Sequence, residues 1–537
     1  MKKSLQTIIF TLTCLIFSTS IFASTITVSG DITTNTSWTN DNIYLLQGFV
    51  YVKGGATLTI QEGTLIKGDK VSKGTLIITS TGKINAAGTN CNPIVFTSNQ
   101  DVDSREPGDW GGVIILGNAP INLKDSATGT PIRGTIEGGI DNTAGDGKYG
   151  GSDANDNSGT FQYVRIEYPG IAFLPNNEIN GLTMGGVGAG TTIDHIQVSY
   201  SGDDSYEWFG GTVNCKYLVA LGGTDDDFDT DFGFSGKCQF LLGVRDSSYY
   251  DAAGASNGFE SDNDATGTTH TPFTSAVFSN VTLVGPKNTL TTPVASYFKR
   301  GMHIRRNSNI SVYNTVVMGW PIGEFIEGTL SQTNFSTGTA DIKNNTWAGC
   351  NVNHAALFDS TFVPSVGNNN SFLSTASAAM LTDPFNLTNV NPLPLTGSPV
   401  LTGASYTASN LSSSFFDKTG TYRGAFGTTN WMTCWTNFNP QASLYNSVVN
   451  IPNLTNVSLF PNPSNGVSNL SISTDKNMNM TIRVVDMNGR LVSELQNGML
   501  NSGAHSFAIQ TAELQKGLYV IQMVSEQNTQ SLKLVVE

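Results

Sequence analysis

The sequence predicts an all-β protein, in which a long solenoid of stacked strands precedes a small domain of antiparallel strands. Three observations support this prediction. Gly, Asn, Ser and Thr are abundant and only 13% of the 537 residues are charged, a profile typical of turn-rich secreted proteins. Short apolar lines recur along most of the chain. An acidic stretch near the middle appears three times in related form.

Size and charge narrow the class of protein. A chain of 537 residues is long enough for two or more domains. The formal charge is −14, from 28 basic and 42 acidic side chains. An acidic balance argues against a nucleic-acid partner.

The N-terminus is typical of a secretory signal peptide, residues 1–23. Lys2 and Lys3 form a positive start, residues 8–17 are apolar, and Ala23 precedes the expected cleavage site. The apolar run is too short to favour a membrane anchor, and no later stretch is apolar enough to span a membrane. We therefore expect an exported mature chain without a membrane span.

Strand-like runs alternate with Gly-, Asn- and Thr-rich turns from residue 43 onward. Residues 56–68 and 74–88 look like two consecutive turns of one coil. A Gly-, Asp- and Asn-rich insertion at residues 141–159 interrupts the pattern, and we expect it to be a surface loop.

Seven related apolar lines follow the insertion, at spacings of mostly 22 to 32 residues. They begin at residues 161, 193, 215, 238, 278, 310 and 342. This pattern predicts a solenoid with inserted loops, which buries a narrow core and exposes long parallel sheets. Such sheets suit the binding of long polymers.

The solenoid is organised around the acidic stretch 224–234, Thr-Asp-Asp-Asp-Phe-Asp-Thr-Asp-Phe-Gly-Phe. In a strand, side chains alternate between two faces. This alternation predicts Asp227, Asp229 and Asp231 on one face and the phenylalanines at 228, 232 and 234 on the other.

Two related stretches flank this pattern. A shift of 22 residues places Asp203 on Asp225 and Glu207 on Asp229. A third version at residues 258–264 puts Glu260, Asp262 and Asp264 on one alternation. The acidic residues alternate in the same way along all three strands, which predicts that the strands are successive turns of the coil, stacked about 4.8 Å apart.

A stack of carboxylates needs a partner, and three interpretations stay open. In the first interpretation, the acidic strands bind calcium, which takes several carboxylate and carbonyl oxygens. In the second, the carboxylates cap turns by accepting hydrogen bonds from backbone N–H groups. In the third, they include a catalytic carboxylate pair, as in glycosidases. The candidate calcium ligands are Asp203, Asp204, Glu207, Asp225, Asp226, Asp227, Asp229, Asp231, Glu260 and Asp262.

A basic group at residues 299–306 and several aromatic residues are candidates for contacts to a polymer. We assign substrate binding to Trp208, Arg300 and Arg305. Trp110, Trp208, Trp320, Trp347 and Tyr200 could form a platform for sugar rings or could pack in the core. The basic group could bind a uronate or could simply be a solvated strand edge.

The mature chain keeps five cysteines, so at least one is free or pairs between chains. Cys215 and Cys238 lie 23 residues apart, near the repeat period, and we expect them to stack as neighbours, bridged or unbridged. His195 lies in a strand-like line and is expected to be a partly exposed surface residue.

The sequence pattern changes after a linker at residues 446–457. Short alternating runs over residues 458–537 predict antiparallel strands. Phe460-Pro-Asn-Pro-Ser464, Asp486-Met-Asn-Gly-Arg490 and Leu514-Gln-Lys-Gly-Leu-Tyr-Val520 resemble the C-terminal sorting domain of type IX secretion. The resemblance implies a small antiparallel β-sandwich that the outer-membrane secretion machinery recognises, and hence a secreted or cell-surface protein.

Residues 43–350 resemble right-handed parallel β-helix proteins. Tyr206–Val213 followed by Asp225–Asp231 is similar to secreted β-helix proteins common in Bacteroidetes. Residues 397–440 are similar to that family's closing segment, so we expect a β-helix over residues 24–445 with a cap over its open end from about residue 390.

Three functions are compatible with these features. The first is binding of an extracellular polysaccharide or another polymer, with structural calcium. The second is a calcium-dependent polysaccharide lyase or a glycoside hydrolase, and the third is a structural or adhesive surface role.

Overall fold

The computed structural model describes residues 25–173, 178–356, 367–443, 445, 454–487, 490–525 and 528–537. The predicted signal peptide and most of the predicted linker lie outside these residues. The chain divides into two compact units, one containing Thr25–Leu444 and the other containing Tyr445–Glu537. The expected parallel β-helix and the expected antiparallel C-terminal domain are both confirmed.

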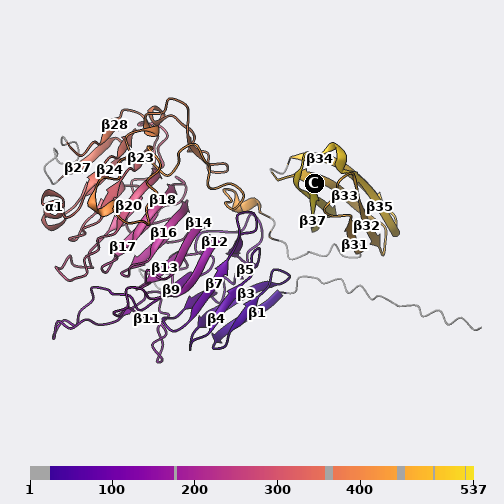
Figure 1. Ribbon diagram of the computed structural model, residues 1–537. Coiled ribbons are helices and arrows are strands. Elements are labelled where there is room, and N and C mark those ends of the chain that lie inside the picture. The colour runs from indigo at the N-terminus through magenta and orange to yellow at the C-terminus, as the bar shows by residue number, and fades with distance from the viewer. Residues whose placement is uncertain are drawn as a thin grey trace, which may run out of the picture. The chain divides into compact units, whose positions relative to one another are not determined.

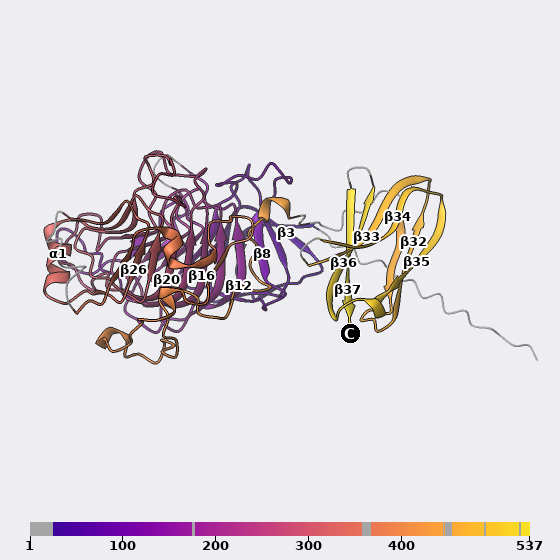
Figure 2. The same cartoon turned by 90° about the horizontal axis from the view of Figure 1, so that it is seen from above.

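The first unit is a parallel solenoid with three ladders of stacked strands, here named ladders A, B and C (Figure 1). β1 (Thr25–Ile32) pairs with β3 (Ile43–Val52), which runs through ladders B and C. Five long strands run through ladders A and B: β12 (Gly159–Glu167), β14 (Thr192–Ser199), β16 (Asn214–Leu221), β18 (Lys237–Val244) and β20 (Val277–Val284). Figure 2 shows the rungs following one another along the solenoid from β3 to β26.

Shorter strands complete the three ladders. Ladder A also has β2 (Thr36–Trp38), β4 (Thr57–Ile60), β7 (Lys83–Ala87), β22 (Ser311–Tyr313) and β25 (Ile342–Lys343). Ladder B also has β5 (Leu65–Gly68), β8 (Ile94–Ser98), β23 (Val316–Met318), β26 (Thr346–Ala348) and β28 (Ser371–Leu373). Ladder C has β6 (Thr75–Ile78), β9 (Gly112–Leu116), β13 (Leu182–Gly185), β15 (Tyr206–Phe209), β17 (Phe228–Asp231), β19 (Phe259–Ser261), β21 (Arg300–Ile304), β24 (Ile322–Ile326) and β27 (Val352–Ala356).

The register of ladder C confirms the predicted repeat. Glu207 pairs with Asp229, and Asp229 pairs with Glu260. Tyr206, Phe228 and Phe259 form the adjacent column and are buried in the core. The acidic side chains therefore share the outward face of ladder C.

Two predicted positions in the acidic stretch are wrong. Asp227 precedes β17 and points inward, where an added Cβ on Gly243 would lie 2.5 Å from Asp227 Oδ2. Phe232 follows the strand with φ of 48° and packs outside the core against Phe209. Strict alternation fails at both places because β17 contains only residues 228–231.

The long strands bend at residues in the left-handed region, a conformation uncommon for residues other than Gly. Tyr163, His195, Tyr217 and Phe240 occupy this position in successive rungs, with φ between 48° and 64°. His195 is stacked between Tyr163 and Tyr217, with centroid distances of 4.3 Å to each ring. It is partly exposed, as expected, and the two stacked rings hold it in place.

Cys215 and Cys238 are paired neighbours in the core, as predicted, and they are not bridged. The disulfide joins Cys91 to Cys434. The sequence spacing did not predict this bond, because its partners are 343 residues apart.

In the structure the insertion occupies the whole interval between β9 and β12, so it begins before the predicted residues 141–159, and it covers the first half of ladder C. It contains the two-stranded sheet of β10 (Gly134–Thr135) and β11 (Lys148–Tyr149). Ile136, Ile140 and Tyr149 are buried against outward residues of ladder C that include Ile114 and Leu116. Most of residues 141–159 are exposed or partly exposed, as expected of a surface loop, and the buried Tyr149 packs them onto the sheet.

Residues 376–443, here named the strap, run back along the side of the solenoid. Four backbone carbonyl groups of the strap accept hydrogen bonds from solenoid side chains. The pairs are Asn314 to Ser405, Asn280 to Tyr422, Gln197 to Asn437 and Arg105 to Pro440. The strap buries apolar outward residues of ladder B, such as Leu221 and Leu242, beneath Phe426 and Trp435. Our prediction of a cap over the open end is therefore wrong for these residues, because the apolar surface that they cover lies along the side.

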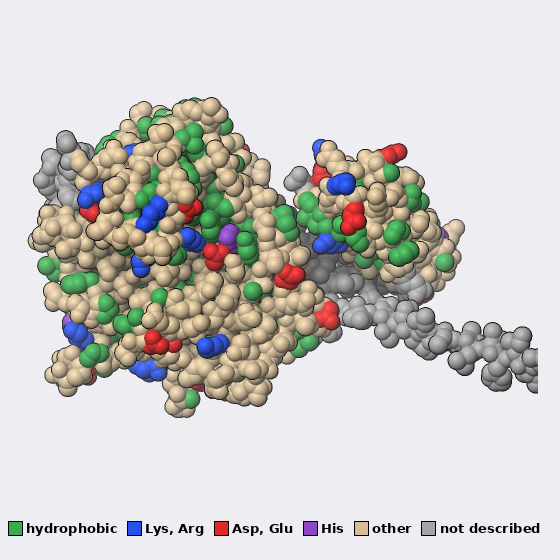
Figure 3. All heavy atoms as spheres, viewed as in Figure 1, with side chains coloured by type: hydrophobic (Ala, Val, Ile, Leu, Met, Phe, Trp, Pro, Cys, Tyr) green, Lys and Arg blue, Asp and Glu red, His purple; other side chains and the backbone are tan. Residues whose placement is uncertain are grey.

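The remaining elements of the first unit are short. They are the helix α1 (Thr329–Ser336), the antiparallel pair β29 (Leu381–Asp383) and β30 (Asn391–Pro394), and 3-10 turns at Ala376–Ala379, Pro399–Leu401, Ser409–Leu411 and Pro440–Ala442. In the view of Figure 3, charged side chains are scattered over a largely uncharged surface. The concentration of carboxylates on ladder C is thus a local feature.

The second unit contains two antiparallel sheets around their own apolar core. One sheet has β31 (Leu454–Phe460), β32 (Val467–Thr474) and β35 (Gly503–Gln510). The other has the order β34 (Leu491–Leu500), β33 (Met478–Asp486), β36 (Gly517–Ser525) and β37 (Asn528–Val536), and a 3-10 turn lies at Thr511–Glu513.

Candidate functional site

The candidate site lies on the outward face of ladder C, where the packed insertion ends. One column of this face contains Thr183, Glu207, Asp229, Glu260 and His303 in successive rungs. The parallel register brings residues together that are 120 positions apart in the chain. The repeat positions these side chains, because each rung returns the same strand to the same face.

The centre of the face is a cluster of carboxylates. Asp203, Asp204 and Asp225 have carboxylate oxygens within 4.8 Å of one another, and so do Asp204, Glu207 and Asp229. Asp204 belongs to both groups, so five carboxylates form one continuous cluster, here named the carboxylate cluster. No Lys, Arg or His among the described residues forms an ion pair with these five.

The cluster is electrostatically strained. Burial, and then the negative charge of neighbouring carboxylates, raises the pKa of Asp203, Asp204 and Asp225 well above the usual value. The same two causes raise the pKa of Glu207 and Asp229. Either protons or a bound cation would relieve this repulsion.

Turn capping accounts for some of the acidic side chains on this face. Asp204 Oδ1 accepts a hydrogen bond from the backbone N–H of Asp226 at 2.7 Å. Asp226 Oδ1 accepts in turn from the N–H of Asn257 at 2.6 Å. Asp231 Oδ1 accepts from the N–H of Phe232. The Asp204 and Asp226 oxygens link one rung to the next, whereas the Asp231 oxygen caps its own strand end.

Glu137 and Asn180 join the site although sequence analysis missed them. Asn180 Nδ2 donates to Glu137 Oε1 at 3.0 Å and also to Glu207. Glu137 and Glu207 share a further hydrogen bond, and burial raises the pKa of Glu137. Glu137 comes from the insertion, whose position depends on apolar packing and not on the repeat.

Several uncharged or unpaired oxygens line the same region. Thr183 and Asn180 are buried, and their Oγ1 and Oδ1 atoms have no hydrogen-bond partner. Asp229 Oδ1 is also buried without a partner. A set of carboxylate, hydroxyl and amide oxygens has the chemistry that hard cations such as Ca²⁺ prefer.

The basic group continues the acidic face instead of forming a separate strand edge. Arg305 pairs with Glu260 and with Asp262, the latter at 2.9 Å, and Arg306 pairs with Asp262 at 2.7 Å. His303 lies 3.3 Å from Glu260. Burial raises the pKa of Glu260, but the His303 hydrogen bond and the charge of Arg305 lower it overall. Glu260 and Asp262 are therefore neutralised by neighbours.

Arg300 is the first residue of β21 and forms no ion pair with a carboxylate among the described residues. It lies over the ring of Phe325 at 4.9 Å and 3.5 Å from His303. Its Nε atom is buried without a partner. Burial lowers the pKa of Arg300, which is consistent with a cation that lacks a bound carboxylate.

Two other predicted site residues do not face this surface. Asp227 is buried in an ion pair with Arg245 at 3.1 Å. Trp208 is fully buried and stacks on Phe234 at 5.3 Å. Trp110, Trp320 and Trp347 are also fully buried, so of the two alternatives for the tryptophans core packing is confirmed and the sugar platform is wrong. All three side chains fill the core instead.

Comparisons with known proteins agree with this architecture. The family described as "Pectate-lyase like beta helix domain" matches residues 30–383. The "Secretion system C-terminal sorting domain" matches residues 458–537, which indicates secretion through the type IX system to the cell surface or the extracellular space. A search of curated proteins gave no match.

Among solved structures, the chain is similar to the Dettilon tailspike protein. The identity is 9%, the match covers 93% of this chain and 85% of that chain, and the TM-score is 0.18. In the described residues, no helix has the length and hydropathy needed to cross a membrane. The family match spans well over half of the sequence, and the chain therefore belongs to the pectate-lyase-like β-helix family.

Proposed function

We propose that this secreted protein binds an extracellular polysaccharide along the outward face of ladder C, with a calcium ion in the carboxylate cluster. The observation that carries the proposal is the cluster itself, five mutually repelling carboxylates without a basic partner among the described residues. A parallel sheet offers an extended surface along which successive units of a polymer could lie.

The calcium ligands in this proposal are Asp203, Asp204, Glu207, Asp225 and Asp229. Calcium takes six to eight oxygens, so a carboxylate set of this size supplies most of a coordination shell. Asp227, Glu260 and Asp262 are no longer part of the set, because basic side chains neutralise them.

The distances favour cation binding over glycoside hydrolysis. Glycosidases hold their two carboxyl groups about 5 to 9.5 Å apart, so that they flank a glycosidic bond. In the cluster the oxygens approach within 4.8 Å, and Glu137 bonds directly to Glu207. Oxygens this close together could coordinate one cation, which supports the calcium proposal.

A calcium-dependent lyase is the second candidate. Arg300 favours it, since an arginine without an ion pair in the described part of the chain could neutralise the carboxylate of a calcium-bound uronate. In this reaction a base accepts the proton beside the carboxylate, the electron pair of the broken C–H bond forms a C=C bond, and the glycosidic oxygen leaves with a proton from an acid or from water.

One experiment separates the candidates. The purified protein is incubated with polygalacturonate, alginate, xylan and laminarin, with calcium and with EDTA. Binding is followed by affinity electrophoresis, and cleavage by unsaturated-product absorbance and reducing ends. We expect calcium-dependent retention without product. Unsaturated product would establish the lyase, and no retention on any polymer would favour the structural or adhesive role.

A further inference from the structure

Two tyrosine side chains are exposed on neighbouring loops of the solenoid. Tyr250 and Tyr297 each keep 37% of their surface exposed, and no other aromatic side chain among the described solenoid residues is as open. Their rings are stacked, with centroids 5.2 Å apart and an interplanar angle of 9°. Buried Phe298 packs edge-on against Tyr250 at 5.9 Å and supports the pair from below.

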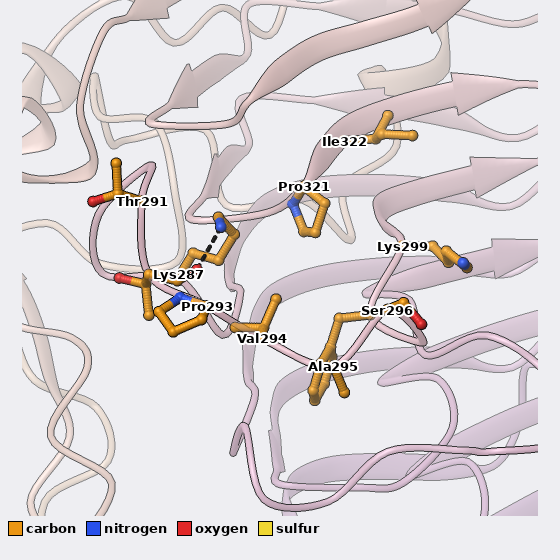
Figure 4. Close-up of a pocket in the computed structure, with 11 residues that line it drawn as sticks. Lys287, Thr291, Pro293, Val294, Ala295, Ser296, Lys299, Pro321 and Ile322 are labelled. Carbon is orange, nitrogen blue, oxygen red and sulfur yellow. Dashed lines mark hydrogen bonds between the residues drawn. The ribbon is translucent and has the colours of Figure 1, made fainter.

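A pocket of about 500 Å³ lies along residues 287–299, the segment that contains Tyr297, and Figure 4 shows its lining. Its lining includes Ser296 and Phe298, the two neighbours of Tyr297, and the apolar side chains Val294 and Ile322. Lys287 donates a hydrogen bond to the carbonyl of Thr292 at 2.6 Å, which closes the loop around the pocket. This volume is in the range of small-ligand sites.

The tyrosine loops and the carboxylate cluster meet at one corner of the rungs. Ser256 Oγ donates to the carbonyl of Thr224 at 2.6 Å, and Ser256 also forms a β-bridge with Phe298. Asp251 follows Tyr250 directly, and its charge acts on Asp225 in the cluster. A polymer on the cluster would therefore pass close to the tyrosine pair.

We infer that Tyr250, Tyr297 and the adjacent pocket form a sugar subsite, in which one pyranose unit of the bound polysaccharide packs against the tyrosine rings. The inference rests on the polysaccharide binding proposed above. A pyranose ring presents a face of C–H groups between its hydroxyls, and this face fits an aromatic ring that is apolar in the middle and polar at its edge. The lysines and Ser296 at the pocket supply partners for hydroxyl groups.

The structure offers a reason why this pair is not ordinary packing. Core aromatic residues of the solenoid, such as Trp208 and Phe228, are fully buried. Tyr250 and Tyr297 instead stack on each other at the tips of two loops, where burial is incomplete. Tyrosine is enriched at binding surfaces because its ring is apolar and its hydroxyl group is polar.

The test uses whichever of polygalacturonate, alginate, xylan and laminarin retains the wild-type protein in affinity electrophoresis. Tyr250→Ala and Tyr297→Ala should each weaken the affinity about tenfold, because an aromatic contact contributes on the order of one decade. Tyr250→Phe and Tyr297→Phe keep the ring and should bind nearly as wild type. Val71→Ala, at a side chain with 92% exposure, is the matched surface control.

The outcomes separate this inference from the proposed function. If the wild type is retained and both alanine variants bind equally well, the subsite is wrong and polysaccharide binding stands. If the wild type is retained by none of the polymers, both proposals fail. Should an alanine variant unfold, Tyr250→Leu and Tyr297→Leu preserve apolar bulk without an aromatic face and must show the same loss.

Discussion

Glu324 lies in a column of ladder C whose three preceding members, Phe228, Phe259 and Met302, are apolar. The register places it directly after Met302, in line with Phe259 and Phe228, and its side chain is buried. Glu324 Oε2 has no hydrogen-bond partner, and burial raises the pKa of this carboxyl to about 8. The core therefore holds Glu324 in its neutral form near neutral pH.

This position predicts a specific pH dependence. The unfolded chain loses the Glu324 proton near pH 4.5, whereas the folded protein keeps it until about pH 8. Its contribution to stability is therefore complete below about pH 4.5, falls as pH rises through this window, and is fully lost above pH 8. The loss amounts to about 5 kcal/mol, at about 1.4 kcal/mol per pKa unit.

Glu324→Gln, which cannot ionise, should be close to wild type at pH 4 and clearly more stable at pH 8.5. Urea unfolding at both pH values measures the difference. Glu106→Gln, at an exposed site, is the control for the loss of one glutamate. An equal effect of Glu324→Gln at both pH values would contradict the buried-carboxyl assignment.

The carboxylate cluster predicts that a bound cation stabilises the folded protein. EDTA should lower the melting temperature, because a ligand at 100 times its Kd stabilises the folded state by about 2.7 kcal/mol. Glu207→Gln and Asp229→Asn should each remove most of this response. The calcium effect should grow from pH 5 to pH 8, since the raised pKa values mean that protons compete for the same oxygens at lower pH.

Differential scanning fluorimetry with calcium and with EDTA checks this prediction. Asp101→Asn removes one exposed negative charge outside the cluster and should leave the calcium response intact. A melting temperature that EDTA does not change in the wild type would leave proton sharing and turn capping as the roles of the cluster.

Single residues show where prediction from sequence succeeded. Glu207, Asp229 and Glu260 could be placed in one column, because a repeat of similar length returns each strand to the same face. Asp227 could not be placed, since the bend before β17 lets its side chain turn inward beside Arg245. Glu137 carries no repeat signal, and its position depends on how the insertion packs.

The strap is the element that sequence patterns described least well. Outward residues of ladder B such as Val219 and Leu242 are apolar, so the sequence pattern predicts that both faces of these strands are buried. Such a pattern indicates that something covers the sheet without saying which segment does so. Only the folded chain shows that residues 376–443 supply the cover and that Cys434 fixes it to Cys91.

The strap should depend on its disulfide. A bond that closes a loop of several hundred residues limits the unfolded chain strongly, and removal of a native disulfide typically costs about 2–5 kcal/mol. Cys91→Ser should therefore lower the melting temperature and make residues 376–443 more sensitive to protease. Cys350→Ser, at a free buried cysteine, is the control for a lost thiol.

Mass spectrometry of limited digests locates the cleavage sites in both variants. We expect cuts within the strap of Cys91→Ser first, because its last part then loses its covalent link to the solenoid and keeps only hydrogen bonds such as those from Arg105 and Gln197 and its apolar contacts. Identical digestion of Cys91→Ser and wild type would mean that the apolar contacts with ladder B suffice to hold the strap.

The two units of the chain have separate hydrophobic cores. The solenoid core is a column of stacked rungs, whereas the C-terminal domain packs its two sheets on residues such as Leu470, Ile482 and Ile521. Domains with their own cores can fold and unfold as independent units. This organisation suits a chain whose C-terminal domain acts as a sorting signal and whose solenoid carries the candidate site.

Removal of residues 458–537 should therefore leave the solenoid intact. Calorimetry of the mature chain is expected to show two transitions, and the truncated chain should retain the solenoid transition at an unchanged temperature. Its polysaccharide affinity and its calcium response should also stay the same, because every residue of the carboxylate cluster and of the tyrosine pair precedes residue 300. In the producing cell, the truncated protein should fail to reach the cell surface. A solenoid transition that shifts by several degrees on truncation would show instead that the sorting domain stabilises the β-helix.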